Sequence, residues 1–267
     1  MPSHTDYWQK DASPETAKNE LSWNFPEQRQ KTLAILGGNS QAFSTEIKLA
    51  ELLLKSFPFL KSVQNFFPDS LKSKLPPLPN LAFFESTDSG SFKKSSELSS
   101  ALIKTDFSLF SGDFSKNSET AIAVSDLLKS AAEIPAVLAR DSLDLVATEA
   151  ASFMTRDNLT LVASLAQLQK LFRALYYPKM LLLSSPLFPV VETLHKFTLS
   201  YPVAILTFHE GQILLAENGR VLSVPLEKTY YTPLTLWSGE VAARFAVYHL
   251  FNPNSRLDSL LAAISKA

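Results

Sequence analysis

The chain has 267 residues, of which 46% are hydrophobic and 11% aromatic, so it can bury the core of one large domain or of two small ones. A formal net charge of −1 gives no electrostatic case for binding nucleic acid or an anionic membrane surface. Cysteine is absent, which excludes disulfides, thiolate metal sites and a cysteine nucleophile, and which fits a reducing cytoplasm.

The first 30 residues are polar and contain no apolar segment of signal-peptide length. We expect an extended arm here, which either packs through Tyr7, Trp8 and Trp23 or stays loose. No stretch of the chain approaches the roughly 18 uninterrupted apolar residues of a membrane span. The sequence therefore predicts a cytoplasmic protein with neither a membrane nor a nucleic acid as partner.

The middle of the chain alternates between short apolar runs and segments with helical spacing. The runs predicted as strands cover 32–36, 62–67, 81–84, 106–110, 134–139 and 159–163. The predicted helices cover 44–57, the end of 86–104, 118–133, a segment from about 141, 165–175 and 185–200. Ser44 or Thr45 and Ser118 are the expected N-caps of two of these helices. Such alternation predicts right-handed βαβ units and a parallel sheet.

Residues 202–226 show a different pattern, with three short apolar runs broken at Glu210-Gly211 and at Asn218-Gly219. An Asn-Gly pair between apolar runs is typical of a two-residue β-hairpin, so we expect antiparallel strands at one edge of the sheet. Two further helices are predicted over 238–251 and 255–266. The sequence thus predicts one three-layer α/β/α domain over 31–267, preceded by an N-terminal arm over 1–30.

Glycine is rare, with seven residues in the chain against an average usage of about 7%. Five of the seven lie in predicted strand-to-helix loops: Gly37, Gly38, Gly90, Gly112 and Gly239. In open α/β sheets, ligands bind beyond the carboxyl ends of the strands, where such loops meet. A tight turn accounts for any one of these glycines equally well, but the set as a whole indicates a site at the carboxyl ends of the strands.

Two of these loops carry polar residues that can bind an anion, an amide, a ribose or a phosphate. The substrate-side candidates are Gly37, Gly38, Asn39, Ser40, Gly112, Asp113, Lys116 and Asn117. Tight turns, or a solvated loop followed by a helix cap, are the structural alternatives. A third loop, from Ser89 to Ser91, is either a flexible lid or a plain linker.

The segment "WSGE", residues 237–240, opens the helix predicted over 238–251. The free N–H groups and positive dipole end of a helix start can stabilise a phosphate or a developing anion. Gly239 would let a ligand approach the backbone closely, and Glu240 can act as a general acid or base. The alternative is an ordinary helix start, with Ser238 as N-cap and Glu240 as a first-turn acid.

Several other catalytic patterns are absent from the sequence. His4, His195, His209 and His249 do not have metal-ligand spacing, and packing or exposure accounts for each of them. The sequence contains no Gly-x-Ser-x-Gly elbow, no P-loop and no Rossmann fingerprint. We therefore predict no metal site built from protein side chains alone.

The order of these features resembles the ribokinase-like superfamily and, within it, the ADP- or ATP-dependent NAD(P)H-hydrate dehydratases. The resemblance covers about 31–267 and rests on "GGNSQAF", "SGDFSKNSET", the late "ENGR" hairpin and "SGE" before the penultimate helix. Matches to the family's first Gly-Gly-Ser turn, its middle glycine-rich loop and its Asp-Ala-Asp segment are Gly37, Gly38, Ser40, Gly112 and Asp141.

The family's anion hole, Gly-Ser/Thr-Gly-Asp, corresponds to Trp237, Ser238, Gly239 and Glu240, with two positions kept and a longer acid at the fourth. Other motifs are lost. The departing positions are Ala139 and Arg140 in Asp-Ala-Asp, Val162, Ala163, Ser164 and Gln167 in Thr-Pro-His…Glu, and Thr207 and Phe208 in Lys-Gly.

The resemblance implies a ribokinase-like sandwich and a lyase that removes water from the hydrated nicotinamide ring of damaged NADH or NADPH. It also implies ADP or ATP with Mg²⁺ as cofactors, NAD(P)H hydrate as substrate, Glu240 as the catalytic carboxylate and association into a homo-oligomer. The lost motifs leave two alternatives open. One is a catalytically inactive nucleotide-binding or assembly module of the same fold, and the other is a small-molecule kinase.

Overall fold

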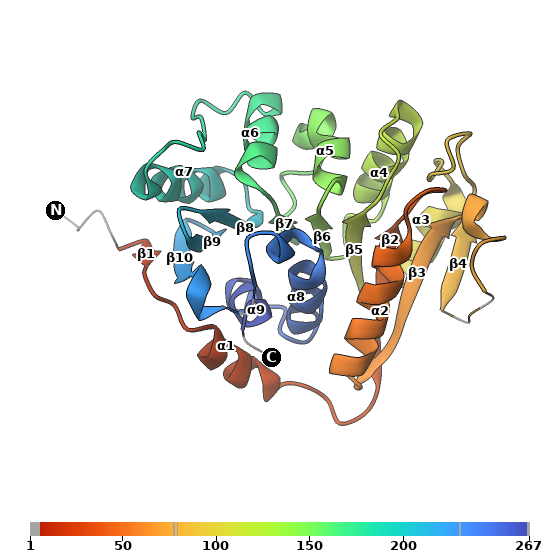
Figure 1. Ribbon diagram of the computed structural model, residues 1–267, viewed down its shortest axis with the longest axis horizontal. Helices are drawn as coiled ribbons and strands as arrows, with labels where there is room; N and C mark the ends of the chain where they lie inside the picture. Colours follow the sequence, from red (N-terminus) through yellow and green to blue (C-terminus); the bar gives the residue numbers. More distant parts are fainter. Residues whose placement is uncertain (1–5, 77, 79, 230, 266–267) are drawn as a thin grey trace.

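The computed structural model describes residues 6–76, 78, 80–229 and 231–265, and the strands of this part form one ten-stranded sheet (Figure 1). The strands are β1 Trp8–Gln9, β2 Gln30–Gly37, β3 Leu60–Pro68, β4 Leu81–Phe84, β5 Phe107–Gly112, β6 Ala136–Ala139, β7 Leu159–Val162, β8 Ala204–His209, β9 Gln212–Glu217 and β10 Arg220–Pro225. Their order is β1-β10-β9-β8-β7-β6-β5-β2-β3-β4. The strands from β2 to β8 pair in parallel, as the alternating pattern predicts.

Two layers of helices cover the sheet. The helices are α1 Pro14–Ser22, α2 Ser44–Ser56, α3 Ser96–Ile103, α4 Ser118–Ser130, α5 Ser142–Val146, α6 Leu165–Ala174, α7 Leu187–Ser200, α8 Glu240–Phe251 and α9 Arg256–Ala263. In Figure 1, α4 to α7 lie above the sheet and α1, α2, α8 and α9 below it. The predicted α/β/α sandwich is therefore confirmed. No helix in the described ranges is long and apolar enough to cross a membrane.

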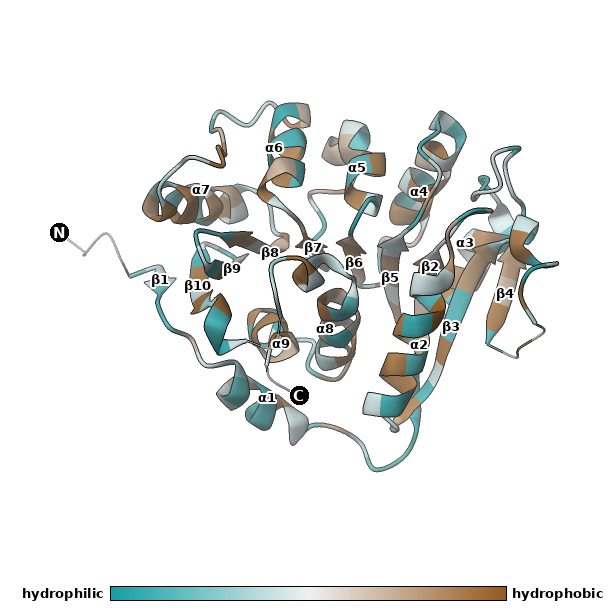
Figure 2. Ribbon diagram, in the orientation of Figure 1, coloured by the Kyte–Doolittle hydropathy of each residue, from teal (hydrophilic) through white to brown (hydrophobic). Residues whose placement is uncertain are grey.

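The central strands are buried on both faces, because each face meets its own helical layer. Along β2, Ala34 and Leu36 pack into the core under α4 to α7, whereas Leu33 and Ile35 pack into the core under α2 and α8. Figure 2 shows the consequence, with mostly brown strands inside helices that carry both colours. A continuous apolar run such as "LAIL" is thus the sequence pattern of a strand covered on both sides.

The late hairpin is confirmed as two tight turns that join β8 to β9 and β9 to β10 antiparallel. Both residues of each turn have positive φ: 45° and 74° at Glu210 and Gly211, and 47° and 77° at Asn218 and Gly219. Two consecutive positive φ angles are the signature of type I′ turns, whose twist matches that of the flanking strands. Sequence and structure agree here because Asn and Gly tolerate this backbone.

The first 30 residues contain more regular structure than the expected extended arm. β1 pairs in parallel with β10, Trp8 Nε1 donates to Ser223 Oγ at 3.1 Å, and Tyr7 stacks on His195 with 3.8 Å between ring centroids. The helix α1, which the sequence analysis missed, packs on α9. The expectation that Trp23 packs is wrong, because its side chain is 88% exposed. The boundary at residue 31 stays a prediction.

Two predicted N-caps are also wrong. Helix α2 begins after Phe43 with no side-chain cap, so neither Ser44 nor Thr45 fills this role. Helix α4 is capped by Asn117, whose Oδ1 accepts from Thr120 N–H at 2.8 Å, and Ser118 is already helical. Asn117 takes the position because its extended backbone leaves its side chain free to reach the first turn.

Candidate functional site

The strand order reverses between β2 and β5. From β2 the chain runs outward to β3 and β4, and it then returns to β5 on the other side of β2. In open α/β sheets, ligands bind beyond the carboxyl ends of the strands at such a reversal. Two of the predicted loops meet here, because Gly38 N–H donates to Gly112 O at 3.0 Å and Asn39 Nδ2 donates to Asp113 O at 2.5 Å. The structure thus brings these candidates together, and their role in binding stays a prediction.

A β-bulge lies at this reversal. Leu36 is opposite Phe110 and Gly37 is opposite Gly112, so Ser111 has no partner in the ladder. The Ser111 hydroxyl connects the two strands instead, since Ser111 Oγ lies 3.0 Å from Leu36 O. A bulge of this kind bends a strand and redirects the residues that follow it.

Gly37 has no room for a side chain. A Cβ atom there would lie 2.5 Å from Gly112 O and 2.6 Å from Ser111 Oγ, and closer still to Glu46 Oε1. We expect Gly37→Ala to destabilise the fold by about 1–3 kcal/mol, because the neighbouring backbone must move. Chemical denaturation measures the change. Gly211→Ala is the control, with nothing within 4 Å but a φ of 74°, and an equal or larger loss there would contradict the prediction.

Glu46 is a buried residue of the site that the sequence analysis missed. It occupies the inward face of α2 together with Leu49, Ala50 and Leu53. Its Oε1 accepts from Ser111 Oγ at 2.8 Å, and its buried Oε2 has no hydrogen-bond partner among the described residues. Burial raises the pKa of Glu46 to about 7. An acid at i of an i, i+3, i+4, i+7 apolar stripe was the signal that could have found it.

Arg140 is the second missed residue, noted in the sequence only as a departure from the family. Its guanidinium binds Asp113 in a bidentate pair, with 2.6 Å from Nη2 to Oδ1 and 3.1 Å from Nη1 to Oδ2. Its Cδ would lie 3.5 Å from a Cβ atom placed on Gly239. The pair therefore reaches from the loop after β5 to the start of α8, with only 23% and 16% of the two side chains exposed.

Asp141, which matches the last acid of the family's Asp-Ala-Asp segment, holds the backbone of Asp113 in place. Its Oδ1 accepts from Asp113 N–H at 2.8 Å, and burial raises the pKa of Asp141. Burial also lowers the pKa of the Arg140 guanidinium, but the hydrogen bonds and charge of Asp113 outweigh that effect and raise it. Arg140 thus stays charged, and the pair is strongly held.

The start of α8 differs from its prediction in one respect. Ser238 is not the N-cap, because it ends the short turn Thr235–Trp237, and Gly239 takes the cap position with a left-handed φ of 98°. Glycine adopts this backbone at little cost. Ser238 Oγ accepts from Glu240 N–H at 3.3 Å. The amides of Val241 and Ala242 find no acceptor among the described residues, so the first turn keeps unsatisfied donors.

The side chain of Glu240 is held beside this helix start. Its Oε1 accepts from Tyr231 Oη at 3.3 Å and lies 3.9 Å from Arg244 Nη1, one turn along the helix. The carboxylate is 27% exposed, so solvent or a ligand can still reach it. Trp237 is half-buried and packs against the core beneath α8.

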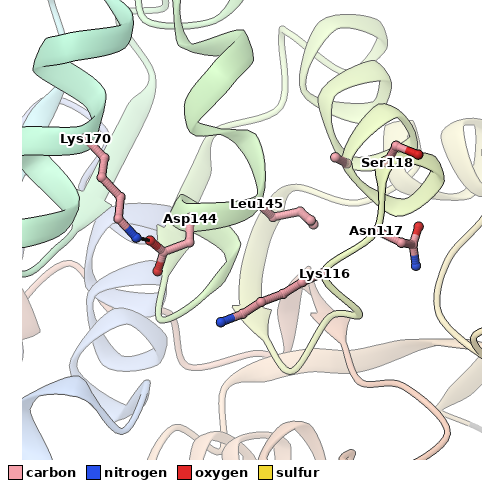
Figure 3. Close-up of a pocket in the computed structure, with 7 residues that line it drawn as sticks. Lys116, Asn117, Ser118, Asp144, Leu145 and Lys170 are labelled. Atoms are coloured by element: carbon pink, nitrogen blue, oxygen red, sulfur yellow. Dashed lines mark hydrogen bonds and ion pairs between the residues drawn. The ribbon is translucent and has the colours of Figure 1, made fainter.

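A pocket of about 390 Å³ lies between the start of α4 and the helices α5 and α6. Its lining includes Lys116, Asn117, Ser118, Asp144, Leu145 and Lys170 (Figure 3). Lys170 pairs with Asp144 there, while Lys116 extends from the loop after β5 toward the same side. Burial raises the pKa of Asp144, but hydrogen bonds from Lys170 and Gln167 outweigh it and lower the pKa.

Gln167 connects this pocket to Arg140. Its Nε2 donates to Arg140 O at 2.6 Å and to Asp144 Oδ2 at 2.9 Å. On the other side, Gly90 O accepts from Ser40 N–H at 2.9 Å, and Ser89 Oγ accepts from Asn117 Nδ2 at 2.7 Å. The loop around Gly90 thus links the two glycine loops, and the predicted residues form one continuous polar rim.

The three histidines in the described part of the chain take no part in this rim. His195 stacks on Tyr7, His209 Nε2 lies 2.6 Å from Ser185 O, and His249 is buried in α8, while His4 lies outside the described residues. Among the residues that the structure describes, no three His, Asp or Glu side chains gather so as to hold a metal ion.

No known family matches the sequence, and no curated protein matches it either. Among solved structures, it is similar to a ribokinase-like superfamily protein of Enterococcus faecalis V583, with a TM-score of 0.70 and 11% identity over 99% of this chain and 87% of that one. It is also similar to a hypothetical protein of Streptococcus mutans, with a TM-score of 0.64 and 12% identity over 95% of this chain and 87% of that one. For an ADP complex of Bacillus subtilis pyridoxal kinase, the TM-score is 0.50 and the identity 12%, over 88% of this chain and 89% of that one.

These likenesses establish the fold class. The chain has the ribokinase-like α/β/α fold, with a mostly parallel sheet and an antiparallel edge hairpin, as the order of its elements predicts. At 11–12% identity they show the fold alone, and they do not single out the hydrate dehydratases.

Proposed function

We propose that the protein binds an adenine nucleotide, ADP or ATP, with its terminal phosphate at the first turn of α8. The observation that carries this proposal is the start of that helix: Gly239 in the left-handed conformation, followed by the unsatisfied amides of Val241 and Ala242. Such a helix start favours a phosphate through its donors and its dipole. The ADP complex among the structures of this fold supports a nucleotide as the ligand.

Mg²⁺ would come with the nucleotide. Because it dehydrates reluctantly, Mg²⁺ is held mostly by water and phosphate oxygens, with only one or two protein carboxylates. Glu240 fits that requirement, since it adjoins Gly239 and keeps 27% of its side chain exposed. A cation between Glu240 and a phosphate would also remove the repulsion between the two negative groups.

For the reaction, we propose dehydration of NAD(P)H hydrate, as the resemblance implies. In outline, the nucleotide activates the ring hydroxyl by phosphoryl transfer, phosphate leaves, and Glu240 assists the proton transfers. The polar rim offers a place for this substrate: Lys116 and Lys170 carry positive charge in the pocket beside the loop after β5. Cations there would favour the phosphates of a dinucleotide.

A second candidate, a nucleotide-binding module without catalysis, is favoured by two observations. Arg140 and Asp113 form a closed bidentate pair beside Gly239, and the bulky Trp237 stands where the family has glycine. Both occupy space next to the helix start. A small-molecule kinase would need the same nucleotide site, and accumulation of a phosphorylated product would identify it.

Replacing Ser238 with aspartate separates a binding role of the helix start from a purely structural one. Ser238 is exposed, and an acid at a helix N-terminus stabilises the helix by about 0.3–1 kcal/mol. The same charge would repel a phosphate. We therefore expect Ser238→Asp to raise the melting temperature without ligand, while the further increase caused by ADP shrinks or disappears.

Thermal denaturation with and without ADP and Mg²⁺ measures both effects. A ligand at 100 times its Kd stabilises the native state by about 2.7 kcal/mol, which a melting curve resolves easily. Ser96→Asp, an exposed position at the start of α3, is the matched control and should leave the ADP effect intact. An ADP effect of full size in Ser238→Asp, or none in the native chain, would overturn the proposed site.

Turnover decides between the enzyme and the module. If the protein is a dehydratase, hydrated NADPH should disappear in the presence of ADP or ATP, and Glu240→Gln should slow the reaction by at least about tenfold. An unchanged rate in Glu240→Gln would remove Glu240 from the mechanism. Nucleotide binding without any turnover would leave the module.

A further inference from the structure

A buried carboxyl group, that of Glu46, lies directly beneath the two glycine loops, Gly37 to Ser40 and Gly112 to Asp113. Glu46 Oε1 packs against the Cα of Gly37, and the carboxyl accepts from Ser111 Oγ at 2.8 Å. The charged groups that act on it are Asp113, from the loop after β5, and Arg140, from the loop after β6. The helix α8 approaches α2 one turn further along, where Gly239 faces Leu49. Glu46 itself is fully buried and cannot touch a ligand.

Ser111 has one hydroxyl hydrogen and two acceptors within reach. Leu36 O lies 3.0 Å from Ser111 Oγ, and Glu46 Oε1 lies 2.8 Å from it. Only one of them can accept that hydrogen at a time. The outcome matters because Leu36 O lies at the β-bulge, where the backbone ladder between β2 and β5 is interrupted.

The protonation state of Glu46 determines whether the Ser111 hydroxyl donates to Leu36 O or to Glu46 Oε1. When Glu46 is neutral, its own O–H can donate to Ser111 Oγ, and Ser111 can donate to Leu36 O, so the chain of donors is complete. When Glu46 is ionised, the carboxylate takes the Ser111 hydrogen, because bonds to charged acceptors are stronger. Leu36 O then loses its side-chain donor, and Oε2 becomes a buried negative oxygen without a partner.

We propose that Glu46 is a proton-responsive positioning residue, whose neutral form holds the bulge and the two glycine loops in place and whose ionised form loosens them. The loops in question are those of Gly37 to Ser40 and of Gly112 to Asp113, joined by the bonds from Gly38 to Gly112 and from Asn39 to Asp113. The further consequence, weaker nucleotide binding at higher pH, rests on the proposed function.

The electrostatic environment supports a transition near neutrality. Burial raises the pKa of Glu46 to about 7, with the charge of Asp113 adding to the shift and the Ser111 hydrogen bond and Arg140 opposing it. Glu46 would therefore be largely neutral at pH 6 and largely ionised at pH 8.5.

Amide hydrogen exchange without any ligand tests the loops directly. After correction for the intrinsic pH dependence of exchange, we expect the amides of Gly38 to Ser40 and of Asp113 to exchange several-fold faster at pH 8.5 than at pH 6. Glu46→Gln, which keeps the shape but cannot ionise, should show no such difference. Glu51→Gln, an exposed position on the same helix, should behave like the native chain.

Ser111→Ala provides a second test that does not alter the acid. Without the shared hydroxyl, the loops should exchange quickly at both pH values, and the pH difference should shrink. The proposal is overturned if Glu46→Gln or Ser111→Ala retains the full pH difference, or if the native chain shows none.

ADP affinity over the same pH range tests the consequence for binding. We expect the Kd of the native chain to rise several-fold from pH 6 to pH 8.5 and that of Glu46→Gln to stay flat. An exchange difference together with no ADP binding at any pH would contradict the proposed function alone. ADP binding with identical pH profiles in both proteins would contradict the positioning role in binding.

Discussion

Replacing Arg256 with methionine is expected to destabilise the fold by about 3–5 kcal/mol, because it removes one partner of a buried ion pair. Arg256 Nε donates to Glu217 Oε1 at 2.5 Å, and its side chain is 6% exposed. The guanidinium also donates to the carbonyls of Asp157, Leu159 and Pro202. This one side chain thus joins α9 to the start of β7, the start of β8 and the end of β9, at the opposite end of the sheet from the glycine loops.

Denaturant unfolding measures the loss. Arg220→Met, an exposed arginine at the start of β10, is the matched control and should change the free energy of unfolding by less than about 0.5 kcal/mol. Removing both charges, in Arg256→Met with Glu217→Gln, should recover part of the loss, since Glu217 is then no longer left as an unpaired buried charge. A loss below 1 kcal/mol in Arg256→Met would show that the carbonyls and Glu217 find other donors.

Replacing His249 with a side chain that cannot be protonated is expected to protect the fold in acid. His249 stacks on Phe245 with 5.3 Å between ring centroids, and its Nδ1 has no partner among the described residues. Burial and, to a smaller extent, the positive charge of Arg256 lower the pKa of His249 to about 4. In the unfolded chain His249 therefore binds a proton near pH 6.5, whereas in the folded chain it binds that proton only near pH 4.

The sign follows from this difference in proton uptake. Between pH 6.5 and 4 the unfolded state binds more protons, so stability falls as the pH falls, by about 3 kcal/mol in total for this residue. His249→Phe and His249→Gln should lack that loss, which denaturant midpoints at pH 7, 5.5 and 4.5 would show. An acid limb as steep as that of the native chain would contradict the prediction.

Glu46 acts in the opposite direction over an overlapping range. Its folded pKa is raised, so the folded state holds the extra proton, and the stability is present below about pH 4.5 and lost as the pH rises toward 7. The two slopes oppose each other between pH 4.5 and 6.5. The single variants His249→Gln and Glu46→Gln are therefore needed to separate them.

The fold was largely predictable, because its signals are local. Apolar runs such as those of β2 and β7, the helix-forming segments between them and the Asn218-Gly219 turn all depend on neighbouring residues. The helix α1 was missed because its mean hydropathy is low and its stability comes from packing on α9, a contact between opposite ends of the chain.

The site was only partly predictable. The positions of the glycine loops and of the start of α8 were predictable, since strand ends and helix starts have recognisable sequence patterns, and their role in binding stays a prediction. Glu46 and Arg140 were not found as site residues, because their partners Ser111 and Asp113 are distant in sequence. The sequence predicts Gly37 as a substrate-side residue, with a tight turn as the alternative, and gives no sign that crowding by Glu46 and Ser111 requires a glycine there.

The proposed function depends on a nucleotide phosphate that binds at the first turn of α8. The most direct test is a titration of the ¹⁵N-labelled protein with ADP and Mg²⁺, followed through its backbone amide resonances. We expect the amides of Gly239, Val241 and Ala242 to shift downfield and to saturate together, since a phosphate would accept their hydrogens. Saturable shifts elsewhere that leave these amides unmoved, or no shifts at all, would contradict it.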